Sequence, residues 1–157
     1  MAKRKTLKAW DAINGAEGCC IATIDGEVED MIYVKDIKAK IEKEKSEIKV
    51  LGQTGTKHKA TGWKGTGSMT MYYATTLFRK MIVKYVDEGV DTYFDLLIEN
   101  EDPSSEIGKQ TIILKQVNID EVDIAKLDID SKELDEELNF TFNGVEIRSE
   151  FDKVVGE

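Results

Sequence analysis

Residues 63–102 read WKGTGSMTMYYATTLFRKMIVKYVDEGVDTYFDLLIENED, and this stretch decides the fold. It begins as a glycine-punctuated strand with alternating apolar residues. Apolar residues at helical spacing then predict one amphipathic helix over about 77–88, with a threonine cap before it and Gly89 as its stop. An aromatic-rich strand is predicted over 93–99. The stretch holds no catalytic or metal-binding signature.

Strands and turns also account for most of the chain upstream. Residues 19–24 and 27–34 are predicted to form a hairpin around Asp25-Gly26, a dipeptide typical of two-residue turns. Residues 35–51 alternate between apolar and charged side chains, which predicts a long hairpin with a charged tip. A helical turn over the run KEKSE, 43–47, is the alternative for this segment. Residues 52–67 hold five of the twelve glycines. We interpret them as a long mobile loop, which is uncommon in a compact domain unless it has a function.

The downstream part of the chain completes a mainly β (α+β) pattern. Residues 110–119 predict a strongly apolar strand, and Asn143-Gly144 predicts the turn of a final hairpin. About eight strands and one helix, with no alternation of strands and helices, favour antiparallel pairing. We expect an antiparallel β-barrel or two packed sheets with one flanking helix, in a single domain over 1–157 that begins with an arm over 1–17.

Composition narrows the classes of function. The chain has 157 residues and a formal net charge of −9. This balance argues against a nucleic-acid groove as the main function, because phosphate binding needs clustered lysine and arginine. No apolar run has the length of a membrane span, and no apolar segment follows the basic N-terminus as in a signal peptide. We therefore expect synthesis in the cytosol and no membrane binding by this chain.

Motifs for chemistry are weak throughout. His58 is the only histidine and lies between two lysines, which favours a surface residue over a catalytic or zinc-binding one. The glycine-rich segment matches neither the P-loop nor the dinucleotide template. The acidic tract 120–137 lacks the residues that a calcium-binding loop needs at 132 and 133. We expect no catalytic, metal or cofactor site and no enzyme, with a carboxylate-based enzyme as a remote alternative.

The cysteines Cys19 and Cys20 are adjacent in the sequence. Neighbouring residues of a strand point to opposite faces, so an ordinary disulfide between them is not expected. We predict one core and one surface cysteine, in a reducing compartment.

Two stretches carry a resemblance to a known family. They read LGQTGTKHKATGWKGTGSMTMYYATTLFRKM, over 51–81, and YVDEGVDTYFDLLIENEDPSSEIGKQTIILKQVNID, over 85–120. Their most specific parts are GWKGTGS, the YFD strand and NEDPSSEIGKQT. The sequence resembles the tail tube proteins of contractile-tailed phages, of the PBSX-like defective-prophage type, over nearly the whole chain.

The resemblance implies a β-barrel or sandwich with a flanking helix. It implies hexameric rings of one protein, stacked into a hollow tube inside a contractile sheath, for DNA passage or envelope puncture. The implied partners are other copies of the chain and the tail sheath, baseplate and tail-terminator proteins, with DNA only as passing cargo. Such a protein is made in the bacterial cytoplasm and assembled into the tail of a virion or phage-like particle. The resemblance supplies no catalytic residues.

A structural tube subunit is the first hypothesis, because stacked rings need sheet edges and long loops that reach other subunits. The candidates for ring-to-ring contact are the hairpin over 35–51 and the loop over 52–67. An acidic lumen would repel DNA phosphates. The alternative is a monomeric β-barrel module that binds a small ligand between its helix and sheet. The candidate interface residues, with Trp63 as an aromatic anchor, are Gly52, Gly55, Lys57, His58, Lys59, Trp63 and Lys64.

Overall fold

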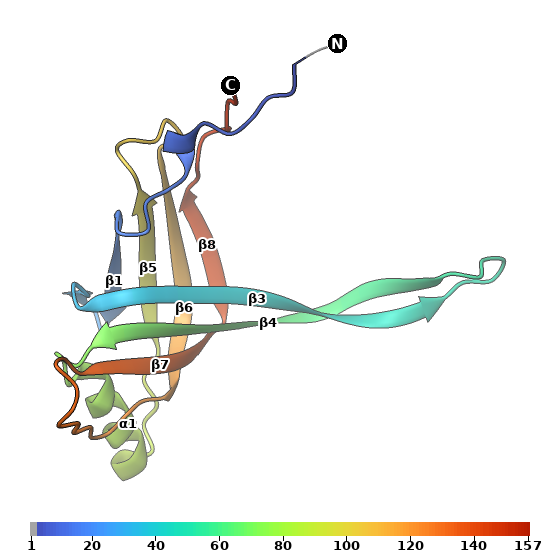
Figure 1. Cartoon of the computed structure of the whole chain (residues 1–157). Coiled ribbons are helices and arrows are strands. Elements are labelled where there is room, and N and C mark those ends of the chain that lie inside the picture. The colour runs from blue at the N-terminus through green and yellow to red at the C-terminus, as the bar shows by residue number, and fades with distance from the viewer. Residues whose placement is uncertain (1–2) are drawn as a thin grey trace. The chain divides into compact units, whose positions relative to one another are not determined.

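The computed structural model describes residues 3–157, so the first two residues of the expected N-terminal arm lie outside it (Figure 1). The described residues form eight strands, one α-helix and one short 3₁₀ helix, Ala9–Asp11. The expected mainly β fold with antiparallel strands and one helix is confirmed. The chain divides into two compact units, and a single domain over 1–157 stays a prediction. Within the described residues, unit 1 comprises 3–32, Tyr93–Gln116 and Val145–Glu157, and unit 2 comprises Tyr33–Thr92 and Val117–Gly144.

Unit 1 is built on a sheet with the strand order β2-β1-β5-β6-β8. The predicted turn at Asp25 and Gly26 joins its first two strands, and both residues have the positive φ angles, 50° and 81°, that such a turn requires. The strands are β1 (Gly18–Ile24), β2 (Glu27–Asp30), β5 (Phe94–Glu101), β6 (Lys109–Glu121) and β8 (Gly144–Ser149). The last residues of β6 pair with β7 and belong to unit 2.

Unit 2 contains the antiparallel order β6-β7-β4-β3 and the helix. The elements are β3 (Val34–Lys49), β4 (Thr56–Tyr72), α1 (Leu77–Glu88) and β7 (Asp135–Phe142). The helix has the predicted bounds and ends at Gly89, whose φ is 71°. The amide of Leu77 donates to Oγ1 of Thr75 at 3.3 Å, which satisfies one of the free amides at the helix start. Phe78 and Met81 are buried and form the inner face of α1.

The glycine-rich segment over 52–67 is mostly strand and not the predicted loop. β4 starts at Thr56, so the long loop expected over 52–67 is wrong, and the turn is confined to the residues between Lys49 and Thr56. The charged run is also not a hairpin tip, because β3 continues through it as one strand. Glycine here makes room for aromatic rings: a Cβ atom on Gly65 would lie 2.4 Å from the Phe142 ring. From the sequence alone the same glycines favour a loop, because the aromatic rings that require them lie on a distant strand.

The C-terminal hairpin is a second correction. β8 follows β7 directly in the sequence, as predicted, but it pairs with β6 and not with β7. The reason is that both edges of β7 are occupied, one by β4 and one by the last residues of β6. The Asn143-Gly144 step therefore moves the chain from one strand neighbour to another without closing a hairpin.

The two cysteines lie as predicted. Cys19 is exposed and Cys20 is buried, where its sulfur lies 3.9 Å from that of Met31. Within residues 3–157 no cluster of three or more histidine, cysteine, aspartate or glutamate side chains is arranged to hold a metal ion. The same residues include no helix with the length and apolar character needed to cross a membrane.

Candidate functional site

The hairpin of β3 and β4 continues well beyond its neighbour β7 (Figure 1). β4 pairs with β7 only from Gly65 to Tyr72, and the partner of Gly65 on β3 is Ile41. We call residues 41–64 the arm, which is distinct from the expected N-terminal arm over 1–17. At about 3.3 Å per residue, the nine residues of β4 in the arm, Thr56–Lys64, extend it by roughly 30 Å.

The arm is exposed on both of its faces. A two-stranded hairpin without a third strand or a covering layer is at best marginally stable in water. The arm nevertheless carries large apolar side chains, and Leu51 at its tip has a relative exposure of 101%. These exposed apolar residues are Ile41, Ile48, Val50, Leu51 and Trp63. A segment of this kind gains stability when another surface packs against it.

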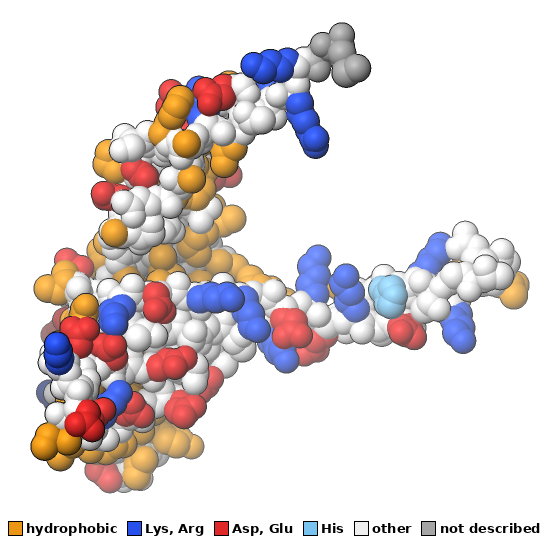
Figure 2. All heavy atoms as spheres, viewed as in Figure 1, with side chains coloured by type: hydrophobic (Ala, Val, Ile, Leu, Met, Phe, Trp, Pro, Cys, Tyr) orange, Lys and Arg blue, Asp and Glu red, His pale blue; other side chains and the backbone are white. Residues whose placement is uncertain are grey.

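The arm is also basic, in a chain that is acidic. It holds six lysines and three glutamates, a net charge of +3, while the whole chain carries −9. Blue side chains accordingly predominate along the arm in Figure 2. Lys64 and Glu42 approach to 3.7 Å across the two strands, but both side chains are more than half exposed, so this pair adds little stability.

All seven residues predicted to contact other subunits lie on the arm. Gly52 and Gly55 belong to its turn, Lys57, His58 and Lys59 to the distal part of β4, and Trp63 and Lys64 to the part nearer β7. The centroid of the Trp63 ring lies 6.5 Å from that of the Phe142 ring, so the tryptophan lies beside β7 at the base of the arm. The role of these seven residues in contacts between subunits stays a prediction.

The seven predicted interface residues do not include the apolar side chains of β3 and of the turn, although the segment over 35–51 is itself a candidate for ring-to-ring contact. Ile41 and Ile48 lie on β3, and Val50 and Leu51 lie in the turn. The period-two alternation places these residues on strand positions, but a turn predicted within the charged run hides the fact that β3 continues as one strand to Lys49.

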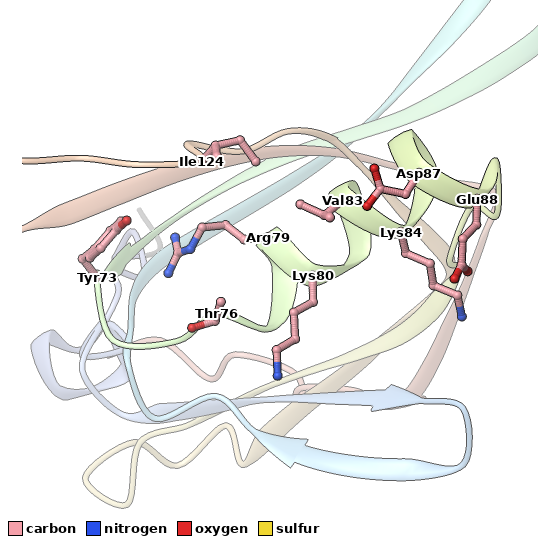
Figure 3. A pocket seen from close by; sticks show the side chains of 9 residues that line it. All are labelled: Tyr73, Thr76, Arg79, Lys80, Val83, Lys84, Asp87, Glu88 and Ile124. Atoms are coloured by element: carbon pink, nitrogen blue, oxygen red, sulfur yellow. The ribbon is translucent and has the colours of Figure 1, made fainter.

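A groove of about 700 Å³ runs along α1 (Figure 3). The helix contributes Arg79, Val83 and its acidic last turn, and Ile124 lines the groove from the segment between β6 and β7. Arg79 is held in place by an ion pair with Glu136 of β7, and its guanidinium carbon lies 4.3 Å from the centre of the Tyr73 ring.

The C-terminal end of α1 is electrostatically negative. Asp87 and Glu88 occupy its last turn, which contains no basic residue, so they add to the negative end of the helix dipole. Asp91 follows closely and accepts a hydrogen bond from Asn118 at 2.7 Å. Burial, together with the negative charge of Asp91, raises the pKa of Asp120. A cation brought to this end of the helix would therefore be stabilised.

Comparison with known proteins identifies the family. Residues 5–148 match the family described as "Phage tail tube protein". Two proteins of Bacillus subtilis (strain 168) are each 41% identical over 141 residues, which cover 90% of this chain and 93% of the relative. They are the phage-like element PBSX protein XkdM and the uncharacterized protein YqbM.

Solved structures share the fold at low sequence identity. A chain of the anti-feeding prophage baseplate superposes with a TM-score of 0.63 at 11% identity, covering 83% of this chain and 91% of that one. A chain of an extracellular contractile injection system, the PVC sheath-tube complex, gives a TM-score of 0.62 at 12% identity, covering 83% and 88%. The family match and the two relatives show that the chain belongs to the phage tail tube protein family.

Proposed function

We propose that this protein is the structural subunit of a tail tube, in which six copies form a ring and rings stack into a hollow tube inside a contractile sheath. The arm is the observation that carries the proposal. It is a long strand pair with both faces in solvent and an apolar tip, and such a strand pair gains stability when another molecule packs against it. Contact of an arm with a different surface on the next copy is heterologous, and such contacts propagate into open-ended assemblies.

The edges of the unit 1 sheet support ring closure. β2 and β8 are its outer strands, and among residues 3–157 no further strand pairs with the outer edge of either. Both present exposed apolar side chains, Val28 on β2 and Ile147 on β8. An unpaired edge is a template for pairing with another chain, and two such edges on one subunit suit a closed ring.

In this proposal, the seven candidate interface residues contact subunits of the adjacent ring. The remaining partners would be the sheath, baseplate and tail-terminator proteins, with DNA as passing cargo or the tube as a puncturing device. The chain acts as one domain, is made in the bacterial cytoplasm and ends up in the particle tail. Its role is structural rather than catalytic, in keeping with the family to which it belongs.

The alternative, a small-ligand module, placed its site between the helix and the sheet. That space is occupied by the buried side chains of Phe78 and Met81. The groove of Figure 3 lies instead along the outer side of α1, where Lys80, Val83 and Lys84 are exposed. This arrangement favours contact with another macromolecule over enclosure of a small ligand.

Shortening the arm tests the proposal. Lys43 and Trp63 are cross-strand partners, so replacing residues 44–62 with an Asn-Gly turn leaves a two-residue connection between them. The wild type is expected to form tubes with a central hole in negative-stain electron microscopy, after seeding with sheared tubes. The shortened variant is expected to remain folded by circular dichroism but to form no stacked rings. Tubes of normal length from the shortened variant would contradict this role of the arm.

A further inference from the structure

The segment between β6 and β7, residues 122–134, exposes an unusual amount of apolar surface. Leu127 and Ile129 have relative exposures of 98% and 99%, and Ile124 is also exposed. Large aliphatic side chains that cluster in solvent within six residues indicate a contact surface more often than a free one. The acidic residues Asp123, Asp128, Asp130 and Glu133 surround them, and all four are exposed.

The groove along α1 joins this segment to the helix. Ile124 lines one side of the groove and Val83 of α1 lines the other (Figure 3). Val86 is exposed in the same part of the helix, next to Asp87 and Glu88. We call residues 83–88 and 122–134 together the acidic face. It combines exposed apolar side chains with a net negative charge and lies entirely in unit 2. The groove itself is mixed in charge, because Arg79, Lys80 and Lys84 line it together with Asp87 and Glu88.

The acidic face and the arm are opposite in charge and alike in apolar character. The acidic face holds six carboxylates and three lysines, a net charge of −3, and the arm holds six lysines and three glutamates, a net charge of +3. One of the three lysines, Lys126, already donates to the carbonyl oxygen of Asp135 at 2.7 Å. Each surface also presents an almost fully exposed leucine, Leu51 on the arm and Leu127 on the face.

An arm that binds the acidic face must belong to another copy of the protein. In the chain itself, β3 and β4 carry the arm away from β7 and α1 of the same unit (Figure 1). We propose that the arm of one copy docks on the acidic face of a second copy, with Leu51 entering the groove beside Ile124 and Val83. This inference rests on the proposed function and names the surface that receives the arm in an adjacent ring.

Cross-linking tests the contact without requiring a tube. In a Cys19→Ser background, Leu51→Cys protein is mixed with Ile129→Cys protein and treated with a short bismaleimide. The buried Cys20 remains in both. We expect a covalent dimer that joins residue 51 to residue 129. The matched control replaces Ile129→Cys with Leu7→Cys, which is also exposed but lies in unit 1 outside its strands, and it should give no such product above background.

Charge reversal tests the electrostatic part of the proposal. Lys57→Glu/Lys59→Glu on the arm and Asp128→Lys/Asp130→Lys on the face should each raise the protein concentration needed for assembly about tenfold at low salt, because like charges then oppose each other. Mixed in one chain, the four substitutions should restore assembly to within about threefold of the wild type. Glu17→Lys/Glu101→Lys is the control: both residues are exposed and lie outside the arm, the acidic face and the outer strands β2 and β8, and the change in charge equals that of the face variant.

The outcomes separate this inference from the proposed function. The docking surface would be overturned, and the tube subunit left in place, if the wild type forms tubes, the Leu51→Cys and Ile129→Cys proteins give no cross-link, and both charge-reversed variants assemble at the wild-type concentration. A 51–129 cross-link in a protein that never forms rings or tubes, even after seeding, would support the contact and contradict the tube. Circular dichroism of each variant establishes that it is folded before it is compared.

Discussion

The guanidinium group of Arg79, in the first turn of α1, forms a buried ion pair with the carboxylate of Glu136 in β7. The two side chains are only 11% and 1% exposed. Arg79 also donates to the carbonyl oxygen of Thr75 and lies over the ring of Tyr73. One arginine therefore joins the start of the helix, the segment before it and a strand of the same unit.

Arg79→Met should destabilise the protein strongly, because it leaves the carboxylate of Glu136 buried without its cation. The expected loss in the free energy of unfolding is about 3–5 kcal/mol, measured by urea denaturation. Lys64→Met, which removes a cation from the exposed pair with Glu42, is the control and should cost less than about 1 kcal/mol. Equal effects of the two substitutions would show that the buried pair has no special weight.

Gly67→Ala should also destabilise the protein, because β4 and β7 approach closely at this residue. A Cβ atom there would lie 2.4 Å from the ring of Phe140 and 2.8 Å from the carbonyl oxygen of Lys38. The strands or the ring must move, at an expected cost of about 1–3 kcal/mol in thermal or urea unfolding. Gly55→Ala, with nothing within 4 Å of the added carbon, is the matched control. A Gly67→Ala variant as stable as the control would contradict the packing described here.

The stability of unit 1 should depend on the charge of Asp102. The backbone amides of Asn14 and Ser104 donate to its carboxylate at 3.0 and 2.9 Å, and these hydrogen bonds lower the pKa of Asp102 below its usual value of 3.8. The resulting stabilisation is present above pH 3.8 and is lost as the pH falls through the lowered pKa.

Asp102→Asn should therefore be less stable than the wild type at neutral pH, and the difference should shrink as the pH falls below 3.8. Urea midpoints measured over a series of pH values test this. Glu101→Gln, which neutralises the exposed neighbouring carboxylate, should show a smaller effect at neutral pH. A difference for Asp102→Asn that stays constant down to pH 2 would exclude the assigned hydrogen bonds.

The two thiols should differ in reactivity. Burial raises the pKa of Cys20 to about 12, and burial also raises the pKa of the exposed Cys19, to a lesser extent. Because the thiolate is the reactive form, a thiol reagent at pH 8 should modify Cys19 slowly and Cys20 only after unfolding. Titration of Cys19→Ser protein with and without urea measures this. Rapid labelling of the folded Cys19→Ser variant would mean that Cys20 is accessible.

The sequence predicted α1 well because its signals are local. Helical spacing, a threonine and Gly89 together defined a helix over 77–88, and the structure has the same bounds. The β1–β2 hairpin was predicted for the same reason, since Asp25-Gly26 alone determines its turn. Features that depend on a few neighbouring residues are accessible from one sequence.

The arm and the β6–β8 pair were harder to predict because their partners are distant or their side chains are not buried. β3 and β4 of the arm face water on both sides, so burial imposes no pattern on them. The glycines of β4 have their explanation in β7: Gly65-Thr66-Gly67 lies opposite Phe140-Thr141-Phe142, glycine against phenylalanine. That match joins segments more than seventy residues apart and is visible only once the register is known.

The positive charge of the arm affects the solubility of subunits that are not yet assembled. An extended strand pair with an exposed leucine is a hazard in a concentrated pool of free protein, because such edges aggregate by pairing with one another. Each arm here carries a net charge of +3, so two arms that meet repel. The lysines therefore disfavour pairing between the arms of two unassembled subunits. Binding of an arm to a surface of opposite charge remains favourable.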